Sequence, residues 1–219
     1  MFGRVLRIHT MVLAAVAACV VQVGVSSAVA APTPEGITVT GLPPADPGAG
    51  ARHDRSESGV NALYGPFNIR AQNSNKCLDI AGGPGARSDG DPAIIWDCYG
   101  INQTNQQWYF RDTGDQYVYY LVAVHSNKCL DIAGGPGAVS DGDPAHQWAC
   151  LGYYQTNQKW YLSSYTVDGR TIYKLTAIHS GKCLDVAGGV GAINNGTRVH
   201  QWGCLGDQQT NQRWYLTSP

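Results

Sequence analysis

Asn75-Lys76-Cys77-Leu78-Asp79-Ile80-Ala81-Gly82-Gly83 is the stretch that decides the fold, because the chain contains it three times. It returns at residues 127–135 and at residues 181–189 with the same cysteine, leucine, aspartate and paired glycines. The first cysteines of successive copies are 52 and then 54 residues apart. A period of this length indicates a repeat architecture in which each copy is one structural unit.

Three further features recur at fixed positions in each copy. A second cysteine follows the first after 21 residues, with a tryptophan two residues before it. Another tryptophan, within Thr-Asn-Gln-x-Trp-Tyr, comes 12 residues after that one. These residues are the cysteines Cys98, Cys150 and Cys204, the tryptophans Trp96, Trp148 and Trp202, and the later tryptophans Trp108, Trp160 and Trp214. The three copies are therefore in register along their whole length.

The local sequence of each copy predicts an all-β domain. Residues 117–124 and 171–178 are rich in β-branched and aromatic residues, which favour strands. The Gly-Gly-Pro-Gly and Asp-Gly-Asp clusters predict turns. We find no sustained apolar period of 3.6 residues. Three copies favour a closed three-fold body over an open solenoid, which usually has more repeats and atypical caps.

Six cysteines of the repeats allow fifteen pairings in principle. The constant spacing favours one bond within each copy, because any scheme between copies would break the symmetry. The predicted disulfides are Cys77–Cys98, Cys129–Cys150 and Cys183–Cys204. Zinc binding is the competing use of paired cysteines, but zinc sites favour spacings of two to four residues. A disulfide closing a loop of this length contributes about 3 kcal/mol on the chain-entropy model.

Residues 1–31 are predicted to be a signal peptide, which implies secretion. Arg4 and Arg7 precede an apolar run over residues 11–25, and small residues follow it. The run is shorter than the roughly 20 residues that a membrane-spanning helix needs. An alternative is a lipoprotein, because Val-Ala-Ala precedes Cys19 and would leave that cysteine as a lipid anchor.

Residues 32–61 are predicted to be a disordered Pro/Gly-rich linker. They contain five of the eleven prolines of the chain and few apolar residues. Such a segment cannot bury enough apolar surface to offset its ordering entropy. It is either a spacer or a dispensable propeptide. The folded domain then covers residues 62–218, with repeats at about 64–114, 115–167 and 168–218.

The charge of the chain argues against nucleic acid as a partner. The net charge is −1, and removal of Arg4 and Arg7 with the signal peptide would change it to −3. A nucleic-acid binder usually carries a basic patch, and a polybasic membrane surface is equally unsupported. We expect a soluble secreted protein with no membrane contact after the signal is removed.

The repeated Lys-Cys-Leu-Asp-Ile/Val, Trp-x-Cys and Gln-x-Trp motifs closely resemble the ricin B-type lectin family over residues 62–218. The resemblance implies a β-trefoil of twelve strands, four per copy, in which six close a barrel and six cap it as hairpins. It implies that the Gln-x-Trp tryptophans are core residues. It also implies one shallow sugar pocket per copy, galactose- or xylose-type sugars or their polymers as partners, no cofactor, no metal and a monomer.

In that family the pocket uses the Asp after the first cysteine, an aromatic residue two positions before the second, and the Asn before Gln-x-Trp. Their chemistry suits a pyranose. An aromatic ring stacks on C–H bonds, a carboxylate accepts from hydroxyls, and an amide both donates and accepts. The candidates are Asp79, Trp96, Asn105 and Gln106 in copy one; Asp131, His146, Trp148, Asn157 and Gln158 in copy two; and Asp185, His200, Trp202, Asn211 and Gln212 in copy three.

Each candidate also has a structural interpretation. The tryptophans before the second cysteines could pack on the disulfides, and the aspartates could be turn formers that bond backbone amides. The glutamines could brace backbone and leave the ligand to others. The tyrosines that follow the Gln-x-Trp tryptophans are expected in the core with them. The Asp89-Gly90-Asp91 type of cluster could suggest calcium, but no loop reaches a full ligand set, so we interpret it as a turn.

One position differs between copies. Ile94 stands where the family often has a sugar-contacting Gln, whereas copies two and three have His146 and His200. Copy one is therefore the doubtful site. We hypothesise that binding at the histidine copies weakens as pH falls through about 6.5, where imidazole is protonated. His125 and His179 are interpreted as surface or strand residues and not as metal ligands.

The repeats predict binding without catalysis. Glycoside hydrolases usually place two carboxylates across one bond, whereas the only glutamates, Glu35 and Glu57, precede the repeats. No nucleophile, base and orienting residue recur together. An alternative function is a protein-interaction or inhibitor module on the same scaffold, because one fold hosts many functions.

Overall fold

The computed structural model describes residues 42–45 and 62–219. The predicted signal peptide, Cys19 and most of the predicted linker lie outside these residues. The described part has no helix long and apolar enough to cross a membrane. It contains five 3₁₀ turns and twelve strands: β1 (Leu63–Ala71), β2 (Cys77–Ile80), β3 (Ala93–Trp96), β4 (Trp108–Asp112), β5 (Val118–Ala123), β6 (Cys129–Ile132), β7 (Ala145–Trp148), β8 (Lys159–Val167), β9 (Arg170–Ala177), β10 (Cys183–Val186), β11 (Thr197–Trp202) and β12 (Trp214–Thr217).

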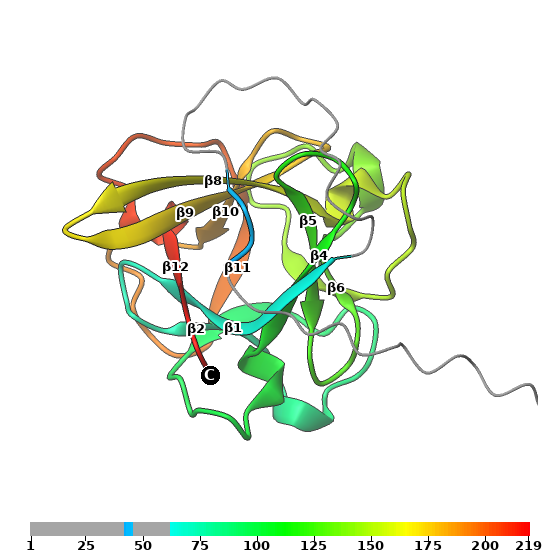
Figure 1. Cartoon of the computed structure of the whole chain (residues 1–219), viewed down its shortest axis with the longest axis horizontal. Helices are drawn as coiled ribbons and strands as arrows, with labels where there is room; N and C mark the ends of the chain where they lie inside the picture. Colours follow the sequence, from blue (N-terminus) through cyan, green and yellow to red (C-terminus); the bar gives the residue numbers. More distant parts are fainter. Residues whose placement is uncertain (1–41, 46–61) are drawn as a thin grey trace, which may run out of the picture. The chain divides into compact units, whose positions relative to one another are not determined.

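Six strands close a barrel (Figure 1). β1 pairs with β4, β4 with β5, β5 with β8, β8 with β9, β9 with β12, and β12 with β1, all antiparallel. Closure leaves no free edge among these strands. The strands predicted over residues 117–124 and 171–178 are confirmed as β5 and β9.

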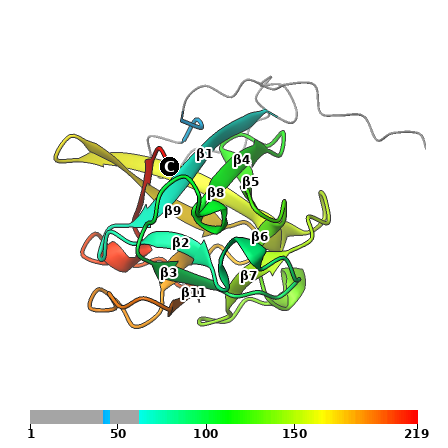
Figure 2. The ribbon, with the colours of Figure 1, turned by 90° about the horizontal axis from the view of Figure 1, so that it is seen from below.

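The other six strands form three hairpins that cap one end of this barrel, as Figure 2 shows for β2, β3, β7 and β11. β2 pairs with β3, β6 with β7, and β10 with β11. The hairpins also join one another, through β11 and β3 and through single bridges at Pro92–His146 and Pro144–His200. Four strands per copy, a closed barrel and a three-hairpin cap confirm the expected β-trefoil.

The Gln-x-Trp tryptophans are confirmed as core residues. Trp108, Trp160 and Trp214 have no solvent exposure. Each indole N–H donates to a backbone carbonyl in the first hairpin strand of its own copy, at 3.0–3.1 Å. The bond satisfies the one polar atom of a buried tryptophan and ties the barrel to the cap.

The tyrosines that follow these tryptophans are expected in the core, and only one of the three is buried. Tyr215 is buried, whereas Tyr109 and Tyr161 are half-buried and lie outside the main core. Successive residues of a strand face opposite sides, so a tyrosine after an inward tryptophan points outward.

The three disulfides form within the copies, as predicted. Cys77 is bonded to Cys98, Cys129 to Cys150 and Cys183 to Cys204. Each bond joins the first hairpin strand to the chain just after the second. The loop that it closes therefore contains the turn and both strands of one cap hairpin.

Residues 42–45, within the predicted linker, lie against the barrel. Pro43 is buried, and Ala45 packs against the hydrophobic core. The Tyr119 hydroxyl donates a hydrogen bond of 2.7 Å to the Pro44 carbonyl. At least this part of the segment is therefore attached to the folded domain.

Candidate functional site

Each copy carries one pocket between its cap hairpin and the 3₁₀ turn that follows the second cysteine. We call them pocket one (Asp79, Trp96, Asn105), pocket two (Asp131, Trp148, Asn157) and pocket three (Asp185, Trp202, Asn211), and their volumes are about 260, 160 and 280 Å³. Pockets for drug-sized ligands are usually about 300 Å³ or larger. These pockets therefore suit a ligand of roughly one sugar unit.

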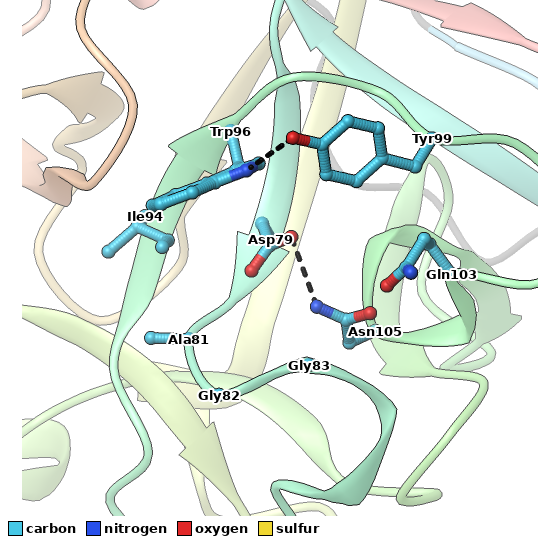
Figure 3. Close-up of a pocket in the computed structure, with 9 residues that line it drawn as sticks. All are labelled: Asp79, Ala81, Gly82, Gly83, Ile94, Trp96, Tyr99, Gln103 and Asn105. Atoms are coloured by element: carbon cyan, nitrogen blue, oxygen red, sulfur yellow. Dashed lines mark hydrogen bonds between the residues drawn. The ribbon is translucent and has the colours of Figure 1, made fainter.

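Pocket one shows the arrangement (Figure 3). Trp96 and Ile94 lie along one side, Gln103 and Asn105 along the other, and Asp79 lies between them. Asp79 is on β2 and Trp96 ends β3, and the register of this hairpin, which pairs Asp79 with Ile94 and Cys77 with Trp96, places Asp79 and Trp96 diagonally on the same face. The 3₁₀ turn Thr104–Gln106 supplies Asn105.

The three aspartates accept hydrogen bonds from side-chain amides, not from the backbone amides that a turn former would use. Asn105 and Gln106 donate to Oδ2 of Asp79 at 3.0 and 2.8 Å. Their counterparts donate to Oδ2 of Asp131, both at 2.8 Å, and Asn211 donates to Asp185 at 2.8 Å. The amides thus fix the orientation of each carboxylate.

The glutamines brace this scaffold and do not line the pockets. Besides its bond to Asp79, Gln106 donates to the Asp97 carbonyl at 2.8 Å and accepts from the Tyr99 amide at 3.0 Å. Gln158 and Gln212 make the same pair of backbone contacts in their copies. The geometry of the three glutamines therefore supports a structural role, in which they brace the backbone and leave the ligand to other residues.

The asparagines keep one free acceptor in each pocket. The Nδ2 group of Asn105 donates both to Asp79 and to the Ile80 carbonyl, at 3.0 Å each. The side-chain oxygens of Asn105, Asn157 and Asn211 are buried and have no hydrogen-bond partner among the described residues. A buried acceptor without a donor is costly, so a hydroxyl from a bound ligand or a water that reached these oxygens would relieve that cost.

His146 and His200 line pockets two and three and contact the aspartates directly. The distance from Nε2 to the carboxylate Oδ1 is 2.8 Å for His146 and Asp131, and 2.9 Å for His200 and Asp185. Each ring also stacks on the tryptophan two residues later, at centroid distances of 5.4 and 5.5 Å. The histidines therefore hold both the carboxylate and the aromatic ring, and their effect on binding stays a prediction.

Pocket one lacks this partner because Ile94 replaces the histidine. Ile94 is buried, and it lies opposite Asp79 in the β2–β3 register. Burial raises the pKa of Asp79 to about 6, despite the two amide hydrogen bonds that lower it. Copy one therefore keeps the Asp, Trp and Asn but holds a carboxylate that gains a proton in the mildly acidic range.

The tryptophans before the second cysteines present part of their rings to solvent. Trp148 is 37% exposed and Trp202 is 39% exposed, and Trp96 is half-buried with its N–H near the Tyr99 hydroxyl at 3.3 Å. All three line their pockets. This exposure fits a stacking platform better than a ring packed onto a disulfide.

The sequence interpretation missed a contact between neighbouring copies. The Asp-Gly-Asp clusters are turns, as expected, but Asp89 of copy one accepts from Lys128 Nζ at 2.6 Å and from the Ala149 amide at 2.8 Å in copy two. Asp141 repeats this toward Lys182 and Gly203 of copy three. The amide partner directly follows the platform tryptophan, so each turn holds the platform of the next copy.

The sequence interpretation also gave no role to the residue between the glutamine and the tryptophan of the Gln-x-Trp motif. Gln107, Lys159 and Arg213 are all buried. Each contacts the loop after the second cysteine: Gln107 donates to the Ile101 carbonyl at 2.7 Å, Lys159 lies over the Tyr153 ring, and Arg213 pairs with Asp207 at 2.9 Å. The signal for these residues was their polar character directly before a core tryptophan.

His125 and His179 are not surface or strand residues. They lie in the turns that follow β5 and β9, and His125 is 5% exposed. His179 lies 2.8 Å from the Ala138 carbonyl of the preceding copy. Burial lowers the pKa of both rings. Within the described residues there is no cluster of three or more His, Cys, Asp or Glu side chains that could hold a metal ion.

A closed three-fold barrel with the same Asp, Trp and Asn pocket in every copy defines a lectin-like β-trefoil. The model of the family described as "Ricin-type beta-trefoil lectin domain-like" matches residues 58–148 and 156–219. The chain belongs to this ricin-type β-trefoil lectin family.

Solved structures agree with this assignment. The designed three-fold symmetric protein ThreeFoil is 36% identical with a TM-score of 0.60, and the match covers 70% of this chain and 98% of that one. An exo-β-1,3-galactanase from Clostridium thermocellum is 27% identical with a TM-score of 0.59, over 74% of this chain and 31% of that one. The C-half of an earthworm R-type lectin in complex with GalNAc is 19% identical with a TM-score of 0.51, over 70% and 98%, and supports the fold.

Proposed function

We propose that this protein is secreted and binds glycans or polysaccharides through its three pockets without chemical change. One observation carries the proposal: every copy sets a part-exposed tryptophan ring, an oriented carboxylate and an asparagine with a free acceptor around one small pocket. The β-trefoil fold alone does not require these three residues around a pocket in every copy.

The set complements a pyranose ring. The indole face takes the C–H face of the sugar, and the carboxylate accepts from its hydroxyls with the strength of a charge-assisted hydrogen bond. The free Asn oxygen accepts a further hydroxyl. Galactose-type sugars are favoured, because the relatives include a lectin in complex with GalNAc and a galactanase; xylose-type sugars are the second choice.

Each pocket is shallow and binds weakly, with dissociation constants of about a millimolar, and useful affinity comes from several pockets on one polymer. Binding of one multivalent glycan by a single monomer is the arrangement we propose. Loss of one pocket should then weaken binding to the polymer far more than binding to a monosaccharide. Light scattering of the free protein checks the monomer.

Catalysis is not part of the proposal. Hydrolysis of a glycosidic bond requires two carboxyl groups about 5–9.5 Å apart around the substrate. Each pocket is lined by a single aspartate, and the residues from 62 onward contain no glutamate. The arrangement thus supports binding of a sugar and gives no pair of groups to cut it.

The decisive test compares a triple variant with a double-variant control on a glycan array that includes galactose, GalNAc and xylose polymers. Trp96→Ala/Trp148→Ala/Trp202→Ala removes the platforms and leaves the buried aspartate network intact. The matched control is Val139→Ala/Ile193→Ala, which changes exposed apolar residues outside the pockets. We expect the control to bind and the triple variant to lose binding. Binding by the triple variant would contradict the proposal and favour the interaction or inhibitor module.

Secretion is tested by the N-terminus of the protein recovered from culture medium. We expect a chain that begins at Ala31 or Pro32, since small residues precede this point. Recovery in the membrane fraction with a lipid on Cys19 would replace this proposal with the lipoprotein.

A further inference from the structure

Two exposed tyrosines, Tyr153 and Tyr154, lie in the loop that borders pocket two, and we call them the rim tyrosines. Tyr153 is 58% exposed and Tyr154 is 86% exposed, in the loop between β7 and β8. This loop also supplies Leu151 and Gln155, which line pocket two, so Tyr154 directly precedes a lining residue. The face of such an exposed ring is apolar surface in contact with water, and a ligand that covered this surface would gain binding free energy.

Buried contacts hold the two rings in place. The Lys159 ammonium lies 3.6 Å from the centre of the Tyr153 ring. Lys159 is only 2% exposed. Lys159 is held in turn by Asp115, at 3.3 Å. A cation–π contact with a desolvated ammonium is stronger than one in water. Tyr153 is therefore fixed from inside the domain.

Tyr153 then positions Tyr154. The two rings meet edge to face, with centroids 5.5 Å apart and planes at 86°. The geometry is the preferred one for an aromatic pair. Tyr154 is thus an ordered ring that keeps most of its surface free beside the pocket.

The other copies have no aromatic ring at the position of Tyr154, although Tyr99 lies in the same loop of copy one and lines pocket one. Asn102 and Gln208 occupy the position of Tyr154 in copies one and three. There the loop is held by other chemistry, the Gln107 bond to the Ile101 carbonyl and the Arg213–Asp207 ion pair. Only copy two combines a buried cation at position x with two tyrosines on the rim.

We propose that Tyr154 is a second aromatic platform, which binds the next sugar unit of an oligosaccharide whose first unit stacks on Trp148. The proposal rests on the function proposed above for pocket two. The ligand class is a saccharide chain of two or more units, each with a C–H face open to stacking. Stacking on one more ring is expected to tighten binding about three- to tenfold.

The experiment isolates pocket two in the Trp96→Ala/Trp202→Ala background. The Trp148 indole N–H is followed by NMR in titrations with galactose, β-1,3-galactobiose and β-1,3-galactotriose, and with xylose, xylobiose and xylotriose. We expect the disaccharide of the preferred series to bind about three- to tenfold more tightly than its monosaccharide. Tyr154→Gln, which installs the copy-three residue, should abolish this gain and leave the monosaccharide dissociation constant unchanged. Val139→Ala in the same background is the control and should keep the gain.

Each other result overturns the inference. A gain with chain length that survives Tyr154→Gln shows that another surface binds the second unit. Weaker monosaccharide binding in Tyr154→Gln shows that Tyr154 shapes pocket two itself. Absence of any shift of Trp148 with either series overturns the function proposed for pocket two, whereas binding of monosaccharide without a gain with length overturns only the second platform.

Discussion

At the scale of single residues, the three pockets differ at one position beside the carboxylate. His146 and His200 bring an imidazole nitrogen within 2.9 Å of Asp131 and Asp185. Ile94 offers Asp79 only an apolar neighbour, and burial raises the pKa of Asp79 to about 6. The same repeat therefore holds two kinds of pocket, which differ in the residue that faces the carboxylate.

Pocket one is expected to lose sugar as the pH falls through about 6. A protonated Asp79 accepts hydrogen bonds less strongly than a carboxylate, so affinity at pH 5 should be about tenfold lower than at pH 7.5 for a pKa of about 6. Titration of a Trp148→Ala/Trp202→Ala variant, followed at Trp96, measures this. Equal affinity at pH 5 and 7.5 would falsify this prediction.

The charged Asp79 carboxylate should lower the free energy of unfolding at neutral pH. The pKa of Asp79 is higher in the folded chain than the ordinary value of 3.8, so the folded state binds the proton more tightly and the free energy of unfolding rises as pH falls from 7 toward 4. Asp79→Asn keeps the acceptor for Asn105 and Gln106 without the charge. We expect it to raise the free energy of unfolding by about 1–2 kcal/mol at pH 7 and by little at pH 4.

Urea unfolding at both pH values provides the measurement. Asp131→Asn is the matched control, because Asp131 has a histidine partner that the substitution would lose. It should give no gain at pH 7. Equal stabilisation by Asp79→Asn at pH 4 and 7 would show that the charge is not its cause.

At the scale of elements, the joints between copies are held by side chains that reach backbone across the repeat boundary. Gln147 of copy two donates to the Ala86 and Ser88 carbonyls of copy one, both at 3.1 Å, and to Asp91 at 2.9 Å. Gln201 makes the corresponding contacts between copies two and three. The joint between copies three and one uses Asn73, whose Nδ2 donates to the Ala192 carbonyl at 2.9 Å.

Gln147→Leu should therefore be strongly destabilising. Gln147 is fully buried and also accepts from the Ser126 hydroxyl at 2.6 Å. Its loss leaves several polar groups without partners, at a cost of about 2–4 kcal/mol. The matched control is Ile95→Leu at the same position of copy one, which should cost less than about 1.5 kcal/mol. Thermal or urea unfolding compares them, and equal effects would mean that Gln147 acts only as a packed side chain.

At the scale of the whole molecule, the barrel and the cap place the pockets around a common pseudo-three-fold axis, and the barrel also holds part of the preceding chain. Tyr119 contributes its ring to the core and its hydroxyl to the Pro44 carbonyl. Pro43 is buried at the same place. Residues 42–45, the part of this segment that the structure describes, are thus held against the domain by the Tyr119 hydrogen bond and the burial of Pro43.

Tyr119→Phe should weaken this attachment without changing the core. The free energy of unfolding should fall by about 1 kcal/mol, the contribution of one hydrogen bond, and exchange at backbone amides near Ala45 should become faster. In a variant that starts at residue 62, the same substitution should have almost no effect on stability. A similar loss in both backgrounds would place the role of the hydroxyl elsewhere.

By itself, the sequence determined the repeat, the disulfides and the strands over residues 117–124 and 171–178, because spacing and residue type within one copy recur three times. Its resemblance to the ricin B-type family implied the Asp, Trp and Asn of each pocket. Only the tertiary structure decided that Gln106 braces the scaffold, that His146 contacts Asp131, that Asp89 holds the platform of the next copy and that Lys159 supports the rim tyrosines. These contacts join residues from different segments or copies, so they exist only once the barrel has closed and brought those segments together.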